Sequence, residues 1–181
     1  SSSTDPSGGV FYPDYFGKNF VLNDLTHEGG LTAIRIEGPI NSVDQRLNRL
    51  SKELGLLDQE LSILDNEQSN IFWNRTKNLE VFKNLKDNLL RIVVPISETL
   101  QVIQKFKNYD IKYFIDWGGS LIWASFDQLN IKILNEIKDI VKKHQGYITL
   151  IKVEEDLKAS ADIFTIDPIK YKISEKIKRS F

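Results

Sequence analysis

Short runs of β-branched and aromatic residues, in which successive side chains alternate in character, recur along the chain and predict β-strands. The predicted strands are residues 31–37, 89–95, 111–117, 120–126 and 147–153. In the second of these, the alternation places Leu90, Ile92 and Val94 on one side and Leu89, Arg91 and Val93 on the other. Such a strand has one aliphatic side suited to a core and one side that carries a charged group.

The third and fourth predicted strands form a β-hairpin, because Gly118 and Gly119 separate them and suit a two-residue turn with positive φ. This turn places one set of side chains, Tyr113, Ile115, Trp117, Ile122 and Ala124, on a face suited to the core. The opposite face carries Phe114, Asp116, Leu121 and Trp123. An acid beside two aromatic rings makes this second face either an ordinary surface or a site.

Apolar residues spaced three or four positions apart predict helices between the strands. The predicted helices are residues 42–54, 65–77, 97–107, 130–144 and 168–181. Ser42 with Gln45, and Asp65 with Gln68, have the spacing of capping boxes. Gly55 occupies the position of a left-handed C-terminal cap.

Two of these helices have apolar stripes that predict which side faces a core. The helix at 42–54 carries the stripe Val43, Leu47, Leu50 and Leu54. For the helix at 97–107, Ser97 is the predicted cap, and Leu100, Ile103 and Phe106 are predicted to point inward. Residues 154–160 are polar and predict a loop or a frayed strand end.

From residue 89 onward the predicted order is strand, helix, strand, strand, helix, strand, which is the ferredoxin-like split βαβ arrangement. The strand and the two helices that precede residue 89 are typical of an incomplete copy of the same arrangement. We therefore expect an α+β fold, an antiparallel sheet with helices on one face. The other face stays open unless a further domain covers it.

Composition narrows the functional classes. The formal net charge of −1 gives no field that would attract nucleic acid, and no stretch approaches the length of a membrane span. The chain has no cysteine and two histidines, which argues against a Cys/His metal site.

Residues 1–19 are expected to be a flexible lead-in followed by an aromatic arm, folded on the protein's own core or docked on a partner. Residues 20–181 are expected to form the domain.

Four phrases carry a resemblance to a known family. They are THEGGLTAIRIEG at 26–38, FWNRTKNLEVF at 72–82, LLRIVVP at 89–95 and FIDWGGSLIW at 114–123. In order and approximate spacing they resemble the C-terminal half of the FAD-binding subunit of bacterial glycolate oxidase (glycolate dehydrogenase), a flavoprotein of the vanillyl-alcohol-oxidase type. The resemblance spans roughly residues 20 to 181, and the DWGG block is its most specific part.

The resemblance implies that this chain is the cap, or substrate, domain of an FAD-dependent 2-hydroxy-acid dehydrogenase that oxidises glycolate to glyoxylate. In that family FAD lies mainly on an N-terminal domain that these residues do not include. We therefore expect no FAD on this fragment and no activity from it alone. The implied partners are the FAD-binding domain and the other glycolate oxidase subunits. The implied location is the cytoplasm or, through those subunits, the periphery of the inner membrane.

Arg35, Arg91, Asp116 and Trp123 are the candidate substrate-binding residues, since they fall in corresponding phases of the predicted strands. An arginine fork matches a carboxylate in a bidentate way, and aromatic rings beside it exclude water. The alternative is that Arg35 and Arg91 form ordinary ion pairs with Glu37 and Asp116. If the cap interpretation holds, Phe114, Asp116, Leu121 and Trp123 are expected on a face that helices leave open, together with both arginines.

His27 is a weaker candidate for a general base, and a loop position is the alternative. His144, near a predicted helix C-terminus, fits a packed or dipole-stabilised side chain. A different class of function also remains open. A free-standing ferredoxin-like module would bind a partner protein or a small effector through its open sheet face.

Overall fold

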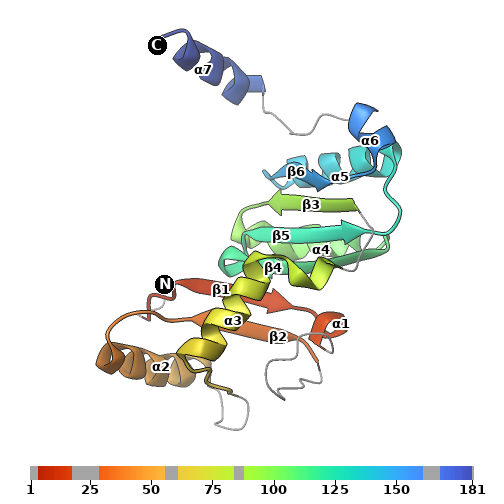
Figure 1. The fold of residues 1–181 in the computed structure, drawn as a ribbon. Coiled ribbons are helices and arrows are strands. Elements are labelled where there is room, and N and C mark those ends of the chain that lie inside the picture. The colour runs from red at the N-terminus through yellow and green to blue at the C-terminus, as the bar shows by residue number, and fades with distance from the viewer. Residues whose placement is uncertain (1–3, 18–28, 56–60, 84–87, 161–167, 181) are drawn as a thin grey trace. The chain divides into compact units, whose positions relative to one another are not determined.

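The computed structural model describes residues 4–17, 29–55, 61–83, 88–160 and 168–180 (Figure 1). Its strands succeed one another in the hydrogen-bonded order β2-β1-β4-β5-β3-β6. The chain divides into two compact units. The first unit consists of Ser1–Leu85 with Phe114–Gly119, and the second of Lys86–Tyr113 with Ser120–Phe181. The α+β class with antiparallel strands is as predicted.

The second unit contains the elements of the predicted ferredoxin-like arrangement. In chain order they are β3 (Asn88–Val93), α4 (Thr99–Phe106), β4 (Ile111–Asp116), β5 (Leu121–Phe126), α5 (Ile131–Lys143) and β6 (Tyr147–Lys152). Of β4, residues 111–113 belong to the second unit and residues 114–116 to the first. β3 lies between β5 and β6 and pairs antiparallel with both. Each helix therefore connects strands that are not adjacent in the sheet, which confirms the split βαβ order.

The core of the second unit lies between its strands and two helices. One side of the strands is buried throughout, with Leu90, Ile92, Ile122, Ala124, Ile148 and Leu150. Figure 1 shows α4 and α5 together on one side of these strands, and they supply the buried side chains Val102, Phe106, Leu134, Ile137 and Val141. The chain enters β6 at Gly146, where an added Cβ would lie 2.6 Å from the carbonyl oxygen of Val93.

Three predictions within the second unit are wrong. The helix expected from Ser97 begins at Thr99, after a short 3-10 turn, and Leu100 is 68% exposed. The inward stripe of α4 consists of Thr99, Val102, Ile103 and Phe106. Leu100 lies outside this stripe, because one residue along an α-helix is a rotation of about 100° from Thr99. Residues 154–160, expected to form a loop or a frayed strand end, contain the helix α6 (Glu155–Ser160), in which Leu157 is buried. The last helix, α7, spans Pro168–Lys178.

The first unit begins with a strand where an irregular aromatic arm was expected. β1 (Gly8–Tyr12) pairs antiparallel with β2 (Leu31–Arg35) along its whole length, and Phe11 pairs with Ile115 of β4. A short helix, α1 (Asp14–Gly17), follows. Val10, Tyr12 and Phe16 are buried, so this segment supplies part of the unit's core.

Aromatic rings fill that core. The ring of Tyr12 contacts those of Phe16, Phe72 and Phe114, and the ring of Phe82 contacts those of Phe16 and Phe114. Phe72 belongs to α3 (Asn66–Lys77), and Phe82 to the 3-10 turn η2 (Glu80–Phe82). Edge-to-face and offset contacts of this kind add to the free energy gained from burial of the rings.

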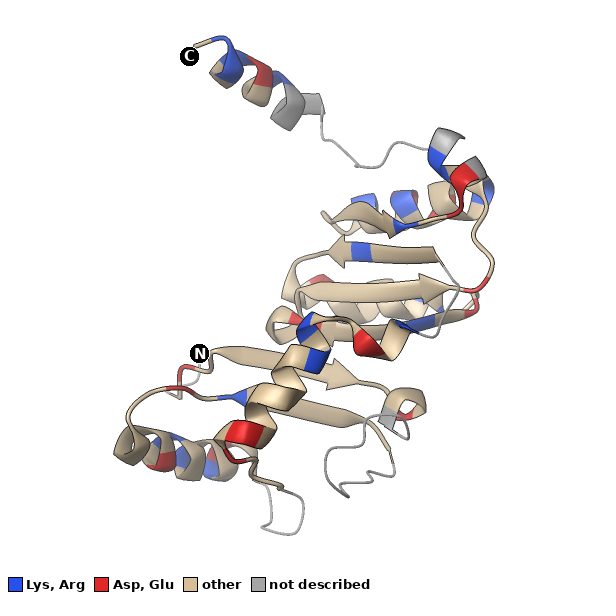
Figure 2. Cartoon of the chain, viewed as in Figure 1, with Lys and Arg blue, Asp and Glu red and all other residues tan. Residues whose placement is uncertain are grey.

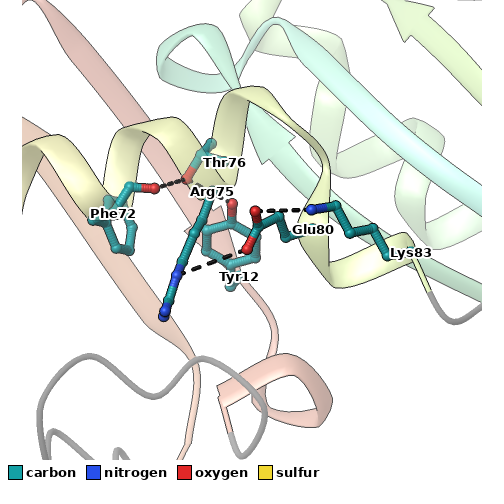
Figure 3. A network of polar contacts seen from close by, with 6 residues as sticks. All are labelled: Tyr12, Phe72, Arg75, Thr76, Glu80 and Lys83. Carbon is teal, nitrogen blue, oxygen red and sulfur yellow. Dashed lines mark hydrogen bonds and ion pairs between the residues drawn. The ribbon is translucent and has the colours of Figure 1, made fainter.

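Polar contacts fix α3 on β1, as Figure 3 shows. The Tyr12 hydroxyl donates to Thr76 Oγ1 at 3.0 Å, and the Thr76 hydroxyl donates to the carbonyl of Phe72 at 3.1 Å. At the end of the helix, Arg75 and Lys83 both pair with Glu80. The buried hydroxyls are therefore satisfied inside the aromatic core.

The caps of the helices in the first unit agree with the sequence only in part. Asp65 and Gln68 form the predicted capping box, and Gly55 has the predicted left-handed conformation with φ of 64°. The capping box at Ser42 is wrong, because α2 (Ile40–Leu54) begins directly after Pro39 and has no side-chain cap. No side chain of α2, all of whose residues are described, is fully buried. Val43, Leu47 and Leu50 of the predicted stripe are half-buried and Leu54 is exposed, so α2 supplies no residue to the buried core.

The link between β4 and β5 is longer than the predicted two-residue turn. Trp117 and the two glycines form a 3-10 turn, η4 (Trp117–Gly119), in which all three residues have positive φ. Trp117 is therefore not a core strand residue, and it is 57% exposed. The Asp116 carboxylate holds this turn, since Oδ1 accepts a hydrogen bond of 2.7 Å from the Trp117 backbone N–H.

Candidate functional site

The side of β3, β5 and β6 that faces away from α4 and α5 carries the candidate site. Side chains alternate along each strand, so the residues between the buried aliphatic ones point to this side. Arg91, Val93, Trp123 and Thr149 are partly exposed here, and Tyr147 is 40% exposed. Leu121 and Ser125 point the same way but are buried. Exposure is thus concentrated around Arg91 and the β6 edge.

The strand register places Arg91 at the centre of a row of three residues. Its direct partner on β5 is Trp123, and its direct partner on β6 is Thr149. Adjacent strands lie about 4.8 Å apart, so the three Cα atoms span roughly 10 Å. The next row in one direction consists of Leu121, Val93 and Tyr147. We call Trp123, Arg91 and Thr149 the Arg91 row.

The three strands of the Arg91 row carry few charged residues. β3, β5 and β6 have the sequences NLLRIV, LIWASF and YITLIK, so Arg91 and Lys152 are their only charged residues. Figure 2 shows the single blue segment of β3, which is Arg91, beside an uncharged β5. The direct strand neighbours of Arg91 are therefore a neutral ring and a hydroxyl.

This arrangement can bind a small carboxylate. The guanidinium group offers five N–H donors in a planar fork that fits two carboxylate oxygens at once. A neighbouring indole supplies apolar surface that limits access of water, and this strengthens a charge-assisted hydrogen bond. The Thr149 hydroxyl can both donate and accept.

Arg35 has a different setting from the one predicted. It lies at the end of β2 in the first unit and pairs with Glu37 at 2.9 Å. The ordinary ion pair, weighed as the alternative for Arg35, is thus what forms. The register places Arg35 opposite Gly8, on the side of β1 and β2 that carries the buried Val10 and Tyr12. The sheet face on which Arg35 lies is thus the one that bears the aromatic core, not an open one.

A cleft of about 490 Å³ adjoins Arg35 in the first unit. It lies among the end of β2, α2 and the start of α3, and has an apolar lining that includes Ile36, Val43 and Leu64. Glu37, Asp44 and Asp65 also line it. The cleft is therefore richer in carboxylates than in cations, which disfavours an anionic ligand.

Asp116 has a structural role in the first unit. Beyond its hydrogen bond to the Trp117 backbone, its charge adds to the rise in the pKa of the buried Tyr12. Phe114, two residues earlier, is fully buried and stacks on Phe82. The expectation that Phe114, Asp116, Leu121 and Trp123 form one open face is wrong at Phe114, which packs on the rings of Tyr12 and Phe82, and at Leu121, which is also buried.

The two histidines add little to the candidate site. His27 lies outside the described residues. His144 follows α5, and its Nδ1 lies 2.6 Å from Oε2 of Glu98 at the start of α4, so this pair ties the two helices together. No cluster of three or more His, Cys, Asp or Glu side chains that could hold a metal ion occurs in the part of the chain that the structure describes.

Of the four predicted substrate-binding residues, the register makes Arg91 and Trp123 direct neighbours. Thr149 was missed, because strand alternation gives the face of a residue but not its partner across the sheet. The ferredoxin-like order does predict that the last strand lies beside the first. That order, combined with the matched phases of Arg91 and Thr149, is the signal that could have suggested the third member.

Comparison with known proteins leaves the family undecided. No family model matches the chain, and no curated protein matches it. Among the described residues, no helix has the length and apolar character that a membrane crossing requires.

Proposed function

We propose that this chain is the carboxylate-binding cap domain of an FAD-dependent 2-hydroxy-acid dehydrogenase, with glycolate as its substrate. The observation that carries the proposal is the Arg91 row, in which an arginine lies between an indole and a hydroxyl on a partly exposed sheet face. Arg91 and Trp123 lie within the phrases LLRIVVP and FIDWGGSLIW, which resemble the FAD-binding subunit of glycolate oxidase.

In this proposal Arg91 binds and orients the substrate carboxylate. Two parallel N–H···O bonds fix the plane of the carboxylate, and this fixes the direction in which the carbon bearing the hydroxyl points. Trp123 packs against the ligand and reduces the water around the ion pair, so the pair is stronger than at an open surface. These are binding and orienting roles, and the cap supplies no redox group.

The cleft beside Arg35 does not fit FAD. The cleft beside Arg35 is lined by Glu37, Asp44 and Asp65, whose charges would repel the diphosphate of the cofactor. The sequence also lacks a glycine-rich phosphate loop. FAD, which accepts the electrons in enzymes of this class, is therefore assigned to the partner domain that the resemblance implies.

The experiment is a titration of the purified chain with glycolate, followed by ligand-observed NMR, for the wild type and two variants. Arg91→Lys keeps the charge but loses the fork, so the dissociation constant should rise about tenfold, close to the loss of one charge-assisted hydrogen bond. Arg35→Lys is the matched control, and it should leave binding unchanged because Arg35 lies in the first unit, outside the Arg91 row.

Equal weakening by both variants would locate binding elsewhere or reveal a nonspecific charge effect. A wild-type chain that does not bind glycolate at all would overturn the proposal. That result would favour the alternative class, a ferredoxin-like module that binds a partner protein or a small effector through the same face.

A further inference from the structure

We propose that Thr149 recognises the 2-hydroxyl group of the ligand whose carboxylate Arg91 holds, and so lets the site distinguish a 2-hydroxy acid from a plain carboxylic acid. This inference rests on the proposed function, since it presumes a carboxylate on Arg91. It assigns a specificity role to a residue on β6, a strand that contributes none of the residues singled out from the sequence.

The position of Thr149 follows from the pairing of β3 with β6. Arg91 pairs directly with Thr149, and the flanking pairs are Leu90 with Leu150 and Ile92 with Ile148. All four flanking residues are buried on the side of the helices, so Thr149 and Arg91 both point to the other side. Thr149 is partly exposed there, directly across the strand pair from Arg91.

Within the Arg91 row, the two neighbours of Arg91 differ in whether they can bind the hydroxyl group of the ligand. In a 2-hydroxy acid the hydroxyl and the carboxylate lie on adjacent carbon atoms, so the group that receives the hydroxyl has to stand beside the group that receives the carboxylate. Thr149 and Trp123 are the two direct neighbours of Arg91. The indole has one donor and no acceptor, whereas a threonine hydroxyl can accept the ligand's O–H and can also donate.

Threonine also suits this task because it is β-branched. Its χ1 angle is restricted on a strand, so the hydroxyl is held in few orientations before the ligand arrives. Tyr147, the nearest other hydroxyl on this side of β6, is two residues away, about 7 Å along the strand, and stands opposite Val93 rather than Arg91. Thr149 is therefore the better placed of the two hydroxyls.

The test compares glycolate with acetate, which has the same carboxylate and lacks the hydroxyl. The wild type should bind glycolate more tightly than acetate. Thr149→Val keeps the shape and removes the hydroxyl, so its affinity for glycolate should fall about three- to tenfold while its affinity for acetate stays the same. Thr149→Ser restores a hydroxyl and should recover most of the preference for glycolate.

Tyr147→Phe is the matched control, because it removes a hydroxyl from the same side of the same strand, one row away, and should leave both affinities unchanged. The inference is overturned if Thr149→Val keeps the wild-type preference, or if it weakens both ligands equally. In those cases the dependence of both ligands on Arg91 would still stand, and with it the proposed function. Failure of the wild type to bind either acid would overturn both.

Discussion

Tyr12 shows how one buried polar side chain connects an early strand to the rest of the first unit. Its ring is fully buried among phenylalanine rings, and its hydroxyl reaches Thr76 of α3. Burial raises the pKa of the phenol; the hydrogen bond with Thr76 opposes this rise, and the Asp116 charge adds to it. Tyr12 is therefore held neutral in the folded protein well above the pH at which an exposed tyrosine ionises.

This gives a prediction for stability at high pH. Because the folded pKa of Tyr12 lies above the unfolded value of about 10, its contribution to stability is complete below pH 10 and is lost as the pH rises above it. Tyr12→Phe should lower the free energy of unfolding by roughly 0.5 to 1.5 kcal/mol at neutral pH. Above pH 10 its stability should fall less steeply than that of the wild type.

Urea unfolding of both proteins near pH 7 and at several values above about 10 measures the two effects. Thr76 can still donate to the Phe72 carbonyl in the variant, so no buried donor is stranded. Parallel curves of stability against pH for the two proteins would contradict the assignment of the raised pKa to Tyr12.

Single residues also show where sequence reasoning succeeds and where it fails. The side of the strand on which Arg91 and Trp123 lie was correct, because alternation is a property of the backbone itself. Arg35 was grouped with them from its phase alone, yet its environment depends on which strand and helix pack beside it. Glu37, two residues away, satisfies its charge. Thr149 needed the strand register, which is set by packing of the whole unit.

At the scale of elements, helix starts depended on which local signal dominates. At α3, Asp65 and Gln68 satisfy each other's backbone donors, and both the box and the boundary were predicted. At α2, Pro39 sets its own φ near −58° and the helix begins directly after it, two residues before Ser42. A proline before the expected cap fixes an earlier start, because its ring pre-organises the turn.

The observed cap Asp65 and the predicted cap Ser42 give a matched pair of substitutions. Asp65→Ala removes a side chain that accepts from the Gln68 backbone N–H, so the free energy of unfolding should fall by about 1 kcal/mol. Ser42→Ala changes a first-turn residue with no capping role and should alter stability by only a few tenths of a kcal/mol. Chemical denaturation measures both, and equal losses from the two variants would contradict the observed start of α2.

The strand β1 is the one strand of the described sheet that the sequence did not predict. A short aromatic run is flanked by Gly8, Gly9 and Pro13, residues that disfavour the interior of a strand, and this pattern predicts an irregular arm. Pairing with β2 over five residues and burial of Val10 and Tyr12 outweigh this weak local preference. Gly9 also permits close approach to the hairpin turn, since an added Cβ would lie 3.3 Å from the Gly118 Cα.

At the scale of the whole molecule, the order of element types from residue 89 predicted the ferredoxin-like arrangement, because short connections leave few ways to arrange two helices and four strands. The division into two units was not predicted. It depends on how β1 and η2 pack against the second half of β4, and these contacts involve residues far apart in the sequence. The Arg91 row lies wholly within the second unit, where the pairing of β3 with β5 and β6 brings its three residues together.

The most direct test of the Arg91 row as a carboxylate site is to map where glycolate binds on the isotope-labelled chain. In two-dimensional NMR spectra recorded during a glycolate titration, the predicted shifts are those of the Arg91 guanidinium, the Trp123 indole N–H and the Thr149 backbone. The spectra of Arg91→Lys should show smaller shifts at the same glycolate concentration. Shifts confined to residues around Arg35, or no shifts on β3, β5 and β6, would contradict the account.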